Sequence, residues 1–218
     1  EASARCERNC ARWSFAGQPV NIAALERWVC AEAGEAGWLP ATAARREERI
    51  AVLGGGAAGL TAAYYLALMG CTVEVFDAGA TLGDALGPGE LGARLPAEAL
   101  AHARQGISAS GVRYHGGAAW GAGLSLADLE STRTTVYLAP GWALAAADVV
   151  AAALGPDWSA CIEPATRQVR GRPQLYIGAP VQAALVEDVA AGRRVAAAIA
   201  RALGRQARSG YRQRGAVP

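Results

Sequence analysis

The sequence predicts an α/β protein in which helices flank a parallel sheet, preceded by a short helical N-terminal segment. Short apolar runs typical of buried strands alternate along the chain with longer stretches of helical periodicity. The first run, Ile50–Leu53, leads through a glycine-rich turn into a helix. A chain of 218 residues has room for one sizeable domain, or for one domain and a small appendage.

Each element follows from a local pattern. Apolar spacing after Asn21 predicts the first helix. Ser125 is placed as the N-cap of a helical turn, and an apolar stripe from Val181 to Leu203 makes the last helix amphipathic. The predicted strands are 50–53, 72–76, 112–115, 135–139 and 175–177. The predicted helices are 21–33, the stretch from the glycine turn to about Met69, 96–110, 126–130, 143–154 and 181–203.

Composition indicates a packed globular protein. Apolar residues make up 52% of the chain, and the net charge of +2 does not suggest a polyanionic partner. All 21 basic residues are arginine, which we attribute to a codon bias of the source. The arginines after Asp188 fit a solvated tail better than a contact with an acidic subunit or nucleic acid.

The absence of a secretory signal and of a membrane span, together with the odd number of cysteines, favours a cytoplasmic setting. No segment reaches the roughly 20 apolar residues of a membrane span, and there is no secretory signal. Five cysteines are an odd number that does not suggest a disulfide framework. A reducing compartment therefore fits best. The sequence begins with Glu1 and not with Met, so whether further residues precede it stays open.

The glycine turn reads Gly54-x-Gly56-x-x-Gly59, and the second strand ends at an acid, Asp77. Strand, glycine turn, helix, strand and acid in this order predict a Rossmann unit that binds a dinucleotide. Gly54 allows the tight turn, Gly56 lets the backbone approach a pyrophosphate, and Gly59 lets the helix lie close to the strand. Free N–H groups and the helix dipole favour phosphate there. The alternative is a glycine turn in an ordinary α/β protein, which the flanking strands and acid disfavour.

Several blocks in order resemble the small (β) subunit of glutamate synthase and related FAD/iron–sulfur NAD(P)H oxidoreductases. The blocks are Cys6-Glu7-x-x-Cys10-x-Arg12, Pro19–Val29, the fingerprint with its helix, Arg94-Leu95-Pro96, the strand ending in Ala139-Pro140-Gly141, and Leu175–Pro180 with the helix after it. The resemblance implies an FAD-binding Rossmann-like domain over 49–218. It also implies that 1–48 is a remnant of an Fe–S-type domain.

Two departures limit the resemblance. The family places a nicotinamide-binding domain between the strand that ends at Gly141 and the strand that begins at Leu175, whereas here 143–173 replaces it and is too short for such a domain. No second glycine motif precedes a helical run, so we expect family-type NAD(P)H binding to be absent. The family also has more cysteines in its N-terminal domain. Cys6 and Cys10 would therefore ligate a [4Fe–4S] cluster only with ligands from missing residues or a partner, and the alternative is structural thiols.

The resemblance also implies cofactor contacts. Gly54, Gly56, Ala57, Ala58 and Gly59 would cradle the pyrophosphate, and Asp77 would hold the adenosine ribose. Further along the cofactor, the expected positions are Gly83, Arg94, Trp120, Gly141, Gly178 and Ala179. Gly178-Ala179 replaces a Gly-Asp pair and so loses a carboxylate that would bond the ribityl chain.

The sequence shows few other residues in patterns typical of metal binding or catalysis. His102 and His115 have no metal-ligand pattern around them and are expected to be structural or on the surface. Cys71 is expected to pack as a small hydrophobe. No catalytic side chain is assigned, because a flavin would itself carry the chemistry.

The sequence thus favours an FAD-binding electron-transfer subunit of a multi-subunit iron–sulfur oxidoreductase. It would pass electrons between flavin and the clusters of partner subunits. A degenerate structural or assembly subunit of such a complex is the alternative. A small NAD-binding protein is a third interpretation.

Overall fold

The computed structural model describes residues 6–86, 96–118, 120, 123–139, 144–178 and 185–204. The chain divides into two compact units between Leu39 and Pro40. Residues 40–48, which the sequence assigned to the first segment, belong to the second unit and hydrogen-bond within it. The backbone N–H of Ala43 donates to the carbonyl of Leu68 (2.9 Å), and that of Arg46 donates to the carbonyl of Gly70 (3.0 Å).

The N-terminal unit contains α2 (Trp13–Ala16) and α3 (Ile22–Glu35), and α3 confirms the helix predicted over 21–33. Asn21 caps α3 by accepting from the N–H of Ala24 (3.1 Å), and Glu7 accepts from the N–H of Ala23 (2.9 Å). Neither helix has a buried residue. The described part of this unit therefore has no hydrophobic core of its own.

The main unit is a six-stranded sheet with the strand order β3-β2-β1-β4-β6-β5. Its strands are β1 (Arg49–Leu53), β2 (Thr72–Phe76), β3 (Arg113–His115), β4 (Thr135–Leu138), β5 (Gln168–Val169) and β6 (Arg172–Ile177). Five strands run parallel, and β5 is antiparallel to β6. The predicted α/β class is confirmed.

The short strand β5 was not predicted, and β6 begins earlier than the expected strand over 175–177. Val169 pairs with Arg172, so a two-residue turn at Arg170-Gly171 makes a small hairpin. Gly171 has a φ of 79°, which glycine adopts without a steric penalty. The hairpin was missed because a two-residue strand shows no apolar periodicity.

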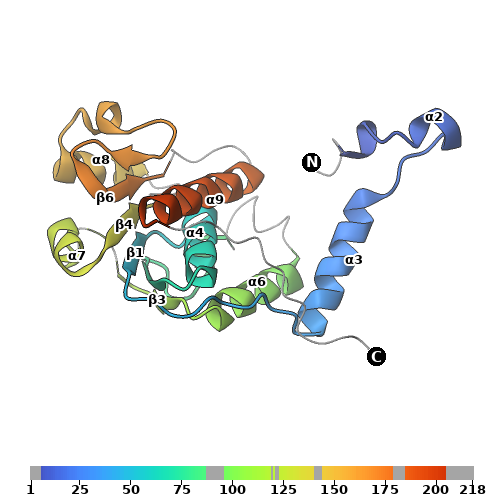
Figure 1. The fold of residues 1–218 in the computed structure, drawn as a ribbon, viewed down its shortest axis with the longest axis horizontal. Helices are drawn as coiled ribbons and strands as arrows, with labels where there is room; N and C mark the ends of the chain where they lie inside the picture. The colour runs from blue at the N-terminus through green and yellow to red at the C-terminus, as the bar shows by residue number, and fades with distance from the viewer. Residues whose placement is uncertain are drawn as a thin grey trace. The chain divides into compact units, whose positions relative to one another are not determined.

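Helices cover both faces of the sheet (Figure 1). The described helices of this unit are α4 (Ala57–Leu68), α6 (Ala97–Ala109), α7 (Leu126–Thr132), α8 (Leu144–Leu154) and α9 (Leu185–Ala202), with the 3₁₀ turns η1 (Asp84–Leu86) and η2 (Trp158–Cys161). Buried residues of α4 and α9 pack on one face. Buried residues of α7 and α8 pack on the other. Ser125 caps α7 as predicted, accepting from the N–H of Asp128 (3.1 Å).

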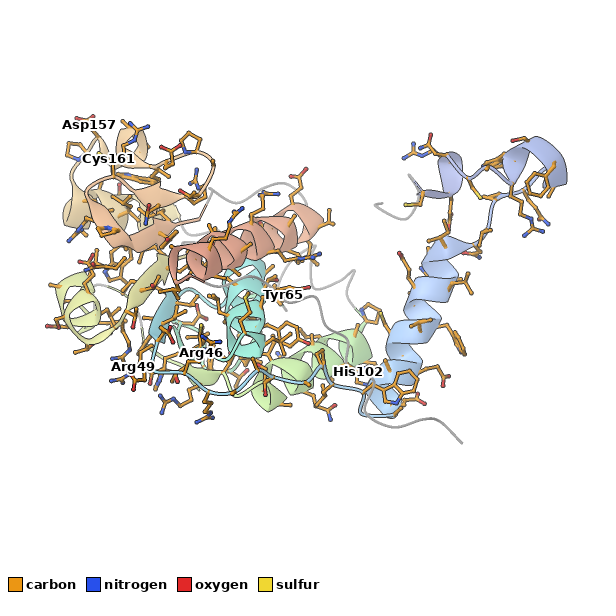
Figure 2. All side chains as sticks on the ribbon, in the orientation of Figure 1. Arg46, Arg49, Tyr65, His102, Asp157 and Cys161 are labelled. Atoms are coloured by element: carbon orange, nitrogen blue, oxygen red, sulfur yellow. The ribbon has the colours of Figure 1, made fainter. Side chains whose placement is uncertain are left out.

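The central packing contact joins α4 to α9. Gly192 of α9 lies so close to α4 that a Cβ at this position would be 2.3 Å from the carbonyl oxygen of Ala58. Beside this crossing, the guanidinium of Arg193 lies 5.1 Å from the ring centre of Tyr65, a cation–π contact (Figure 2 labels Tyr65). The two helices therefore approach through a residue that has no side chain.

A buried carboxylate links β2 to its neighbours β1 and β3 and to the end of α7. Glu74 in β2 is only 6% exposed. Its oxygens lie 2.5 Å from Arg133, 3.1 Å from Arg113, 3.7 Å from His115 and 3.9 Å from Arg49, which is labelled in Figure 2. A buried charge is tolerated when it is paired in this way. His115 also stacks on Phe76 at 4.7 Å, so its role in the structure is packing beside this carboxylate.

We predict that Gly192→Val destabilises the protein, because the new side chain has to displace the backbone of α4. Overpacking of this kind lowers the free energy of unfolding by about 2 kcal/mol. The measurement is urea unfolding followed by circular dichroism. Ala202→Val, at an exposed position of the same helix, is the control and should cost about 0.5 kcal/mol. Equal effects of the two substitutions would contradict the close crossing.

Candidate functional site

The carboxyl ends of the parallel strands form one edge that brings together some of the sequence-predicted residues. Leu53 pairs with Phe76 on one side and with Leu138 on the other, and Leu138 pairs with Ile177. The residues that follow these strand ends are Gly54, Asp77, Ala139 and Gly178. The strand order reverses beside β1, and ligands of open α/β sheets bind at such a switch point.

Two glycines of the turn are required by the fold. Gly54 has a φ of 114°, and a Cβ there would be 2.0 Å from the carbonyl oxygen of Ala139. A Cβ at Gly59 would be 2.0 Å from the carbonyl oxygen of Gly54. The turn, β4 and the first turn of α4 therefore meet backbone to backbone, as the sequence predicted for Gly54 and Gly59.

The third glycine is different, because nothing in the described protein occupies its side-chain position. A Cβ on Gly56 would meet no atom within 4 Å, and its φ is −75°, which any residue adopts. Gly56 is the N-cap of α4, and no side chain caps this helix end. The N–H groups of Ala57, Ala58 and Gly59 therefore begin a helix at an open surface, where they have no acceptor within the helix. This cradle fits a phosphate group.

Asp77 braces the turn from the end of β2. One carboxylate oxygen accepts from the N–H of Gly55 (2.8 Å), and the other accepts from the N–H of Gly79 (3.1 Å). The hydroxyl of Tyr114 lies 3.0 Å from that second oxygen and 3.0 Å from the carbonyl of Gly79. Asp77 thus holds the glycine turn in place, besides the ribose contact that the sequence predicted.

Tyr114 is a site residue that sequence reasoning missed. Burial and then the hydrogen bond to Asp77 raise the pKa of its hydroxyl well above the usual value, so the group stays a neutral donor. The sequence contained one indication of this position, because Tyr114 lies in the predicted strand 112–115. That strand pairs with β2 and places Tyr114 opposite Val75.

The far end of this edge, at β6, holds a second group of polar atoms. The backbone N–H of Gly178 donates to the carbonyl of Leu138 (2.7 Å), which joins the ends of β4 and β6. The guanidinium of Arg167 donates to the carbonyls of Ile177 (3.0 Å) and Gly178 (2.8 Å). A Cβ at Gly178 would lie 2.9 Å from the hydroxyl of Tyr137, so glycine is needed here too.

The remaining predicted cofactor residues lie apart or outside the described residues. Gly83 has a φ of 80° and lies against α6, where a Cβ would be 3.3 Å from the Nε of Arg104. Trp120 packs at the margin of the core on the α7 and α8 face. Arg94, Gly141 and Ala179 lie outside the described residues. Their proposed contacts stay predictions.

The cysteines divide into separate environments. Cys71 is buried, as predicted. In the N-terminal unit, Cys6 is exposed and Cys10 lies just beyond the helical turn that holds Cys6. Backbone hydrogen bonds at Val20 and Arg12 lower the pKa of the Cys10 thiol. In the part of the chain that the structure describes, no group of three or more His, Cys, Asp or Glu is placed to hold a metal ion. Ligation by Cys6 and Cys10 stays a prediction.

Comparison with known proteins finds similarity over parts of this chain. Residues 52–107 match the family described as NAD(P)-binding Rossmann-like domain. The chain is 30% identical over 138 residues to the glutamate synthase [NADPH] small chain of Azospirillum brasilense. It is also 30% identical over 159 residues to the NADP(+)-dependent formate dehydrogenase subunit beta of Moorella thermoacetica. The predicted resemblance is confirmed.

These similarities cover part of each protein. Both alignments cover 62% of this chain, but only 29% and 22% of the two relatives. Among solved structures, Thermovibrio ammonificans THI4 superposes with a TM-score of 0.52 at 15% identity, covering 85% of this chain and 98% of that one. This likeness shows the fold alone. None of the described helices is both long and apolar enough to cross a membrane.

We predict that Tyr114→Phe lowers the free energy of unfolding by about 1 kcal/mol, because it removes a hydrogen bond that supports Asp77. Chemical unfolding at neutral pH measures the change. Tyr65→Phe is the matched control, since its hydroxyl makes no hydrogen bond within the described chain. A loss no larger than that of the control would show that Tyr114 does not support the turn.

Proposed function

We propose that this chain is the FAD-binding electron-transfer subunit of a multi-subunit iron–sulfur oxidoreductase. The observation that carries the proposal is the cradle at Gly56, where a helix begins and no atom of the described residues lies within 4 Å of the side-chain position. The similarity to the glutamate synthase small chain supports FAD in particular, because the blocks beyond the fingerprint resemble that family. The confirmed similarity is to oxidoreductase chains and subunits.

The residues present fit the dinucleotide. Gly54, Gly56 and Gly59 would receive the diphosphate, with the first N–H groups of α4 as donors. Asp77 would bond the adenosine ribose with the lone pairs left after its bonds to the turn. The chain at Gly178 would lie along the flavin end. When bound, the flavin would supply the redox chemistry, and the protein would supply binding, orientation and electrostatics.

The segment between β4 and β6 indicates where the flavin would exchange electrons. Its described residues form α8, η2 and β5, and none of them makes a second strand–glycine turn–helix unit. We therefore propose that electrons travel between this flavin and iron–sulfur clusters of neighbouring subunits. A [4Fe–4S] cluster that includes Cys6 and Cys10 would need ligands from outside the described residues.

The N-terminal unit supports assembly with a partner. Trp28, Leu25 and Val29 of α3 are 61%, 52% and 51% exposed, and Trp13 and Trp38 are also at least half exposed. Large exposed apolar side chains on a unit whose described residues form no core are typical of an interaction surface. The proposed partners are the iron–sulfur and catalytic subunits of the complex.

Two other interpretations differ in the cofactor they require. A degenerate structural subunit would keep the fold without flavin, and the replacement of the family's acid at Ala179 favours it. A nicotinamide-binding protein would use the same turn, and the match of residues 52–107 to an NAD(P)-binding family favours that. The chromophore of the purified complex distinguishes all three.

The test is the visible spectrum of the purified complex, followed by acid release and chromatography of the nucleotide. FAD released in near-stoichiometric amount supports the proposal. An intact complex without bound nucleotide would support the structural interpretation. A released nicotinamide nucleotide would support the third interpretation, and either of these results rules out the proposal.

We predict that Gly56→Val yields a folded protein that retains no FAD. The new side chain fills space that the protein leaves open, so folding is unaffected while the backbone approach to the diphosphate is blocked. Circular dichroism and FAD content are measured together. Gly54→Val should instead unfold the protein, because its side chain meets the Ala139 carbonyl, and Ala101→Val on α6 should change neither quantity. Full FAD content in folded Gly56→Val would place the cofactor elsewhere.

A further inference from the structure

Arg167 lies in the segment that replaces the family's nicotinamide domain, so the resemblance assigns it no role. It is the one non-glycine residue with positive φ in the described chain, at 64°. A long side chain seldom adopts this conformation, which costs roughly 1–3 kcal/mol unless the surroundings hold it. Here the surroundings do hold it, because the Arg167 carbonyl accepts from the N–H of Ile177 (2.9 Å) while its guanidinium donates back to the end of β6.

These bonds leave part of the guanidinium unused. Nε and one terminal nitrogen reach the carbonyls of Ile177 and Gly178, whereas the other terminal nitrogen makes no hydrogen bond within the described chain. No carboxylate of the described residues lies within ion-pairing distance of Arg167, and the sequence from Gly178 to Leu185 contains no acid. Burial lowers the pKa of Arg167. The cation is thus fixed, half-buried and, among the described residues, without a counter-charge.

A second unsatisfied group lies beside it. Tyr137 in β4 is 0% exposed, and its hydroxyl makes no hydrogen bond in the described structure. A buried hydroxyl without a partner costs about 1–3 kcal/mol. Burial raises the pKa of this hydroxyl, Arg167 opposes the rise, and Asp188 of α9 adds to it. The group is therefore a neutral donor that shares the Gly178 corner with Arg167.

We propose that Arg167 and Tyr137 form an anion subsite at the carboxyl ends of β4 and β6, which binds an anionic oxygen of the dinucleotide held by the glycine turn. This proposal rests on the proposed function. The subsite lies on the same strand edge as Gly56, on the β6 side of the switch point. A rigid arginine fork suits an oxyanion. The anionic oxygen comes from one of two parts of the ligand, the diphosphate or the N1–C2=O end of the flavin, which gains negative charge on reduction.

The test uses variants that separate the guanidinium from the backbone conformation. Arg167→Asn removes the charge but keeps a residue that tolerates positive φ, and Arg167→Gly is the second variant if the asparagine protein does not fold. Arg170→Asn is the matched control: it makes the same change in the same hairpin, at a side chain that is 64% exposed. Tyr137→Phe removes only the hydroxyl. Urea unfolding checks each protein.

Two measurements distinguish the sources of the anion. Calorimetric titration of the apoprotein compares FAD with ADP, which carries the diphosphate but no flavin. If the subsite binds the diphosphate, Arg167→Asn raises the dissociation constants of both FAD and ADP about tenfold or more. If it binds the flavin end, ADP affinity is unchanged and the midpoint potential of bound FAD becomes more negative. In either case Tyr137→Phe gives a smaller change in the same quantity, and Arg170→Asn gives none.

Unchanged ADP affinity, FAD affinity and midpoint potential in folded Arg167 variants would overturn the subsite while leaving the proposed function intact. If Tyr137→Phe leaves the ADP affinity, the FAD affinity and the midpoint potential unchanged and raises the free energy of unfolding, the Tyr137 hydroxyl is not part of the subsite. Conversely, wild-type protein that binds ADP but not FAD would reject the proposed function, and the ADP comparison would still decide the role of Arg167. Binding of neither ligand overturns both.

Discussion

The structure depends on three backbone segments approaching without side chains between them. Gly54 lies against the carbonyl of Ala139, and Gly59 lies against the carbonyl of Gly54. These contacts fix β1, β4 and the start of α4 relative to one another. They also determine where the helix N–H groups point. The same steric requirement therefore sets both the position of the sheet's switch point and the shape of the cradle beside it.

Local sequence patterns were sufficient for most elements and for the glycine turn. Their determinants, such as apolar runs, the Ser125 cap and the fingerprint spacing, lie within a few residues of one another. The missed features depend on residues far apart in the chain. Glu74 stands in an apolar strand and is tolerated because cations from β1, β3 and the C-cap of α7 lie around it. Tyr114 and Arg167 likewise gain their roles from neighbouring strands, which one-dimensional periodicity does not encode.

The two ends of the binding edge differ in how well their polar groups are satisfied. At the end of β2, both oxygens of Asp77 are engaged with the turn and with Tyr114. At the other end of the described edge, a cation lacks a counter-charge and a buried hydroxyl lacks a hydrogen-bond partner. A satisfied network stiffens a site before the ligand arrives, whereas an unsatisfied one gains its missing partners from the ligand. If the proposed dinucleotide binds along this edge, we therefore expect it to gain most new hydrogen bonds on the β6 side.

The contact between α4 and α9 has a consequence for the order of folding. It joins Ala58, near the start of the main unit, to Gly192, close to the end of the described chain. During synthesis on the ribosome, the face of α4 that meets α9 has to wait until almost all of that unit has emerged. Pairing over such sequence separation raises the contact order and slows folding. The newly made chain therefore leaves the face of α4 around Ala58 and Thr61 accessible to chaperones until α9 packs against it.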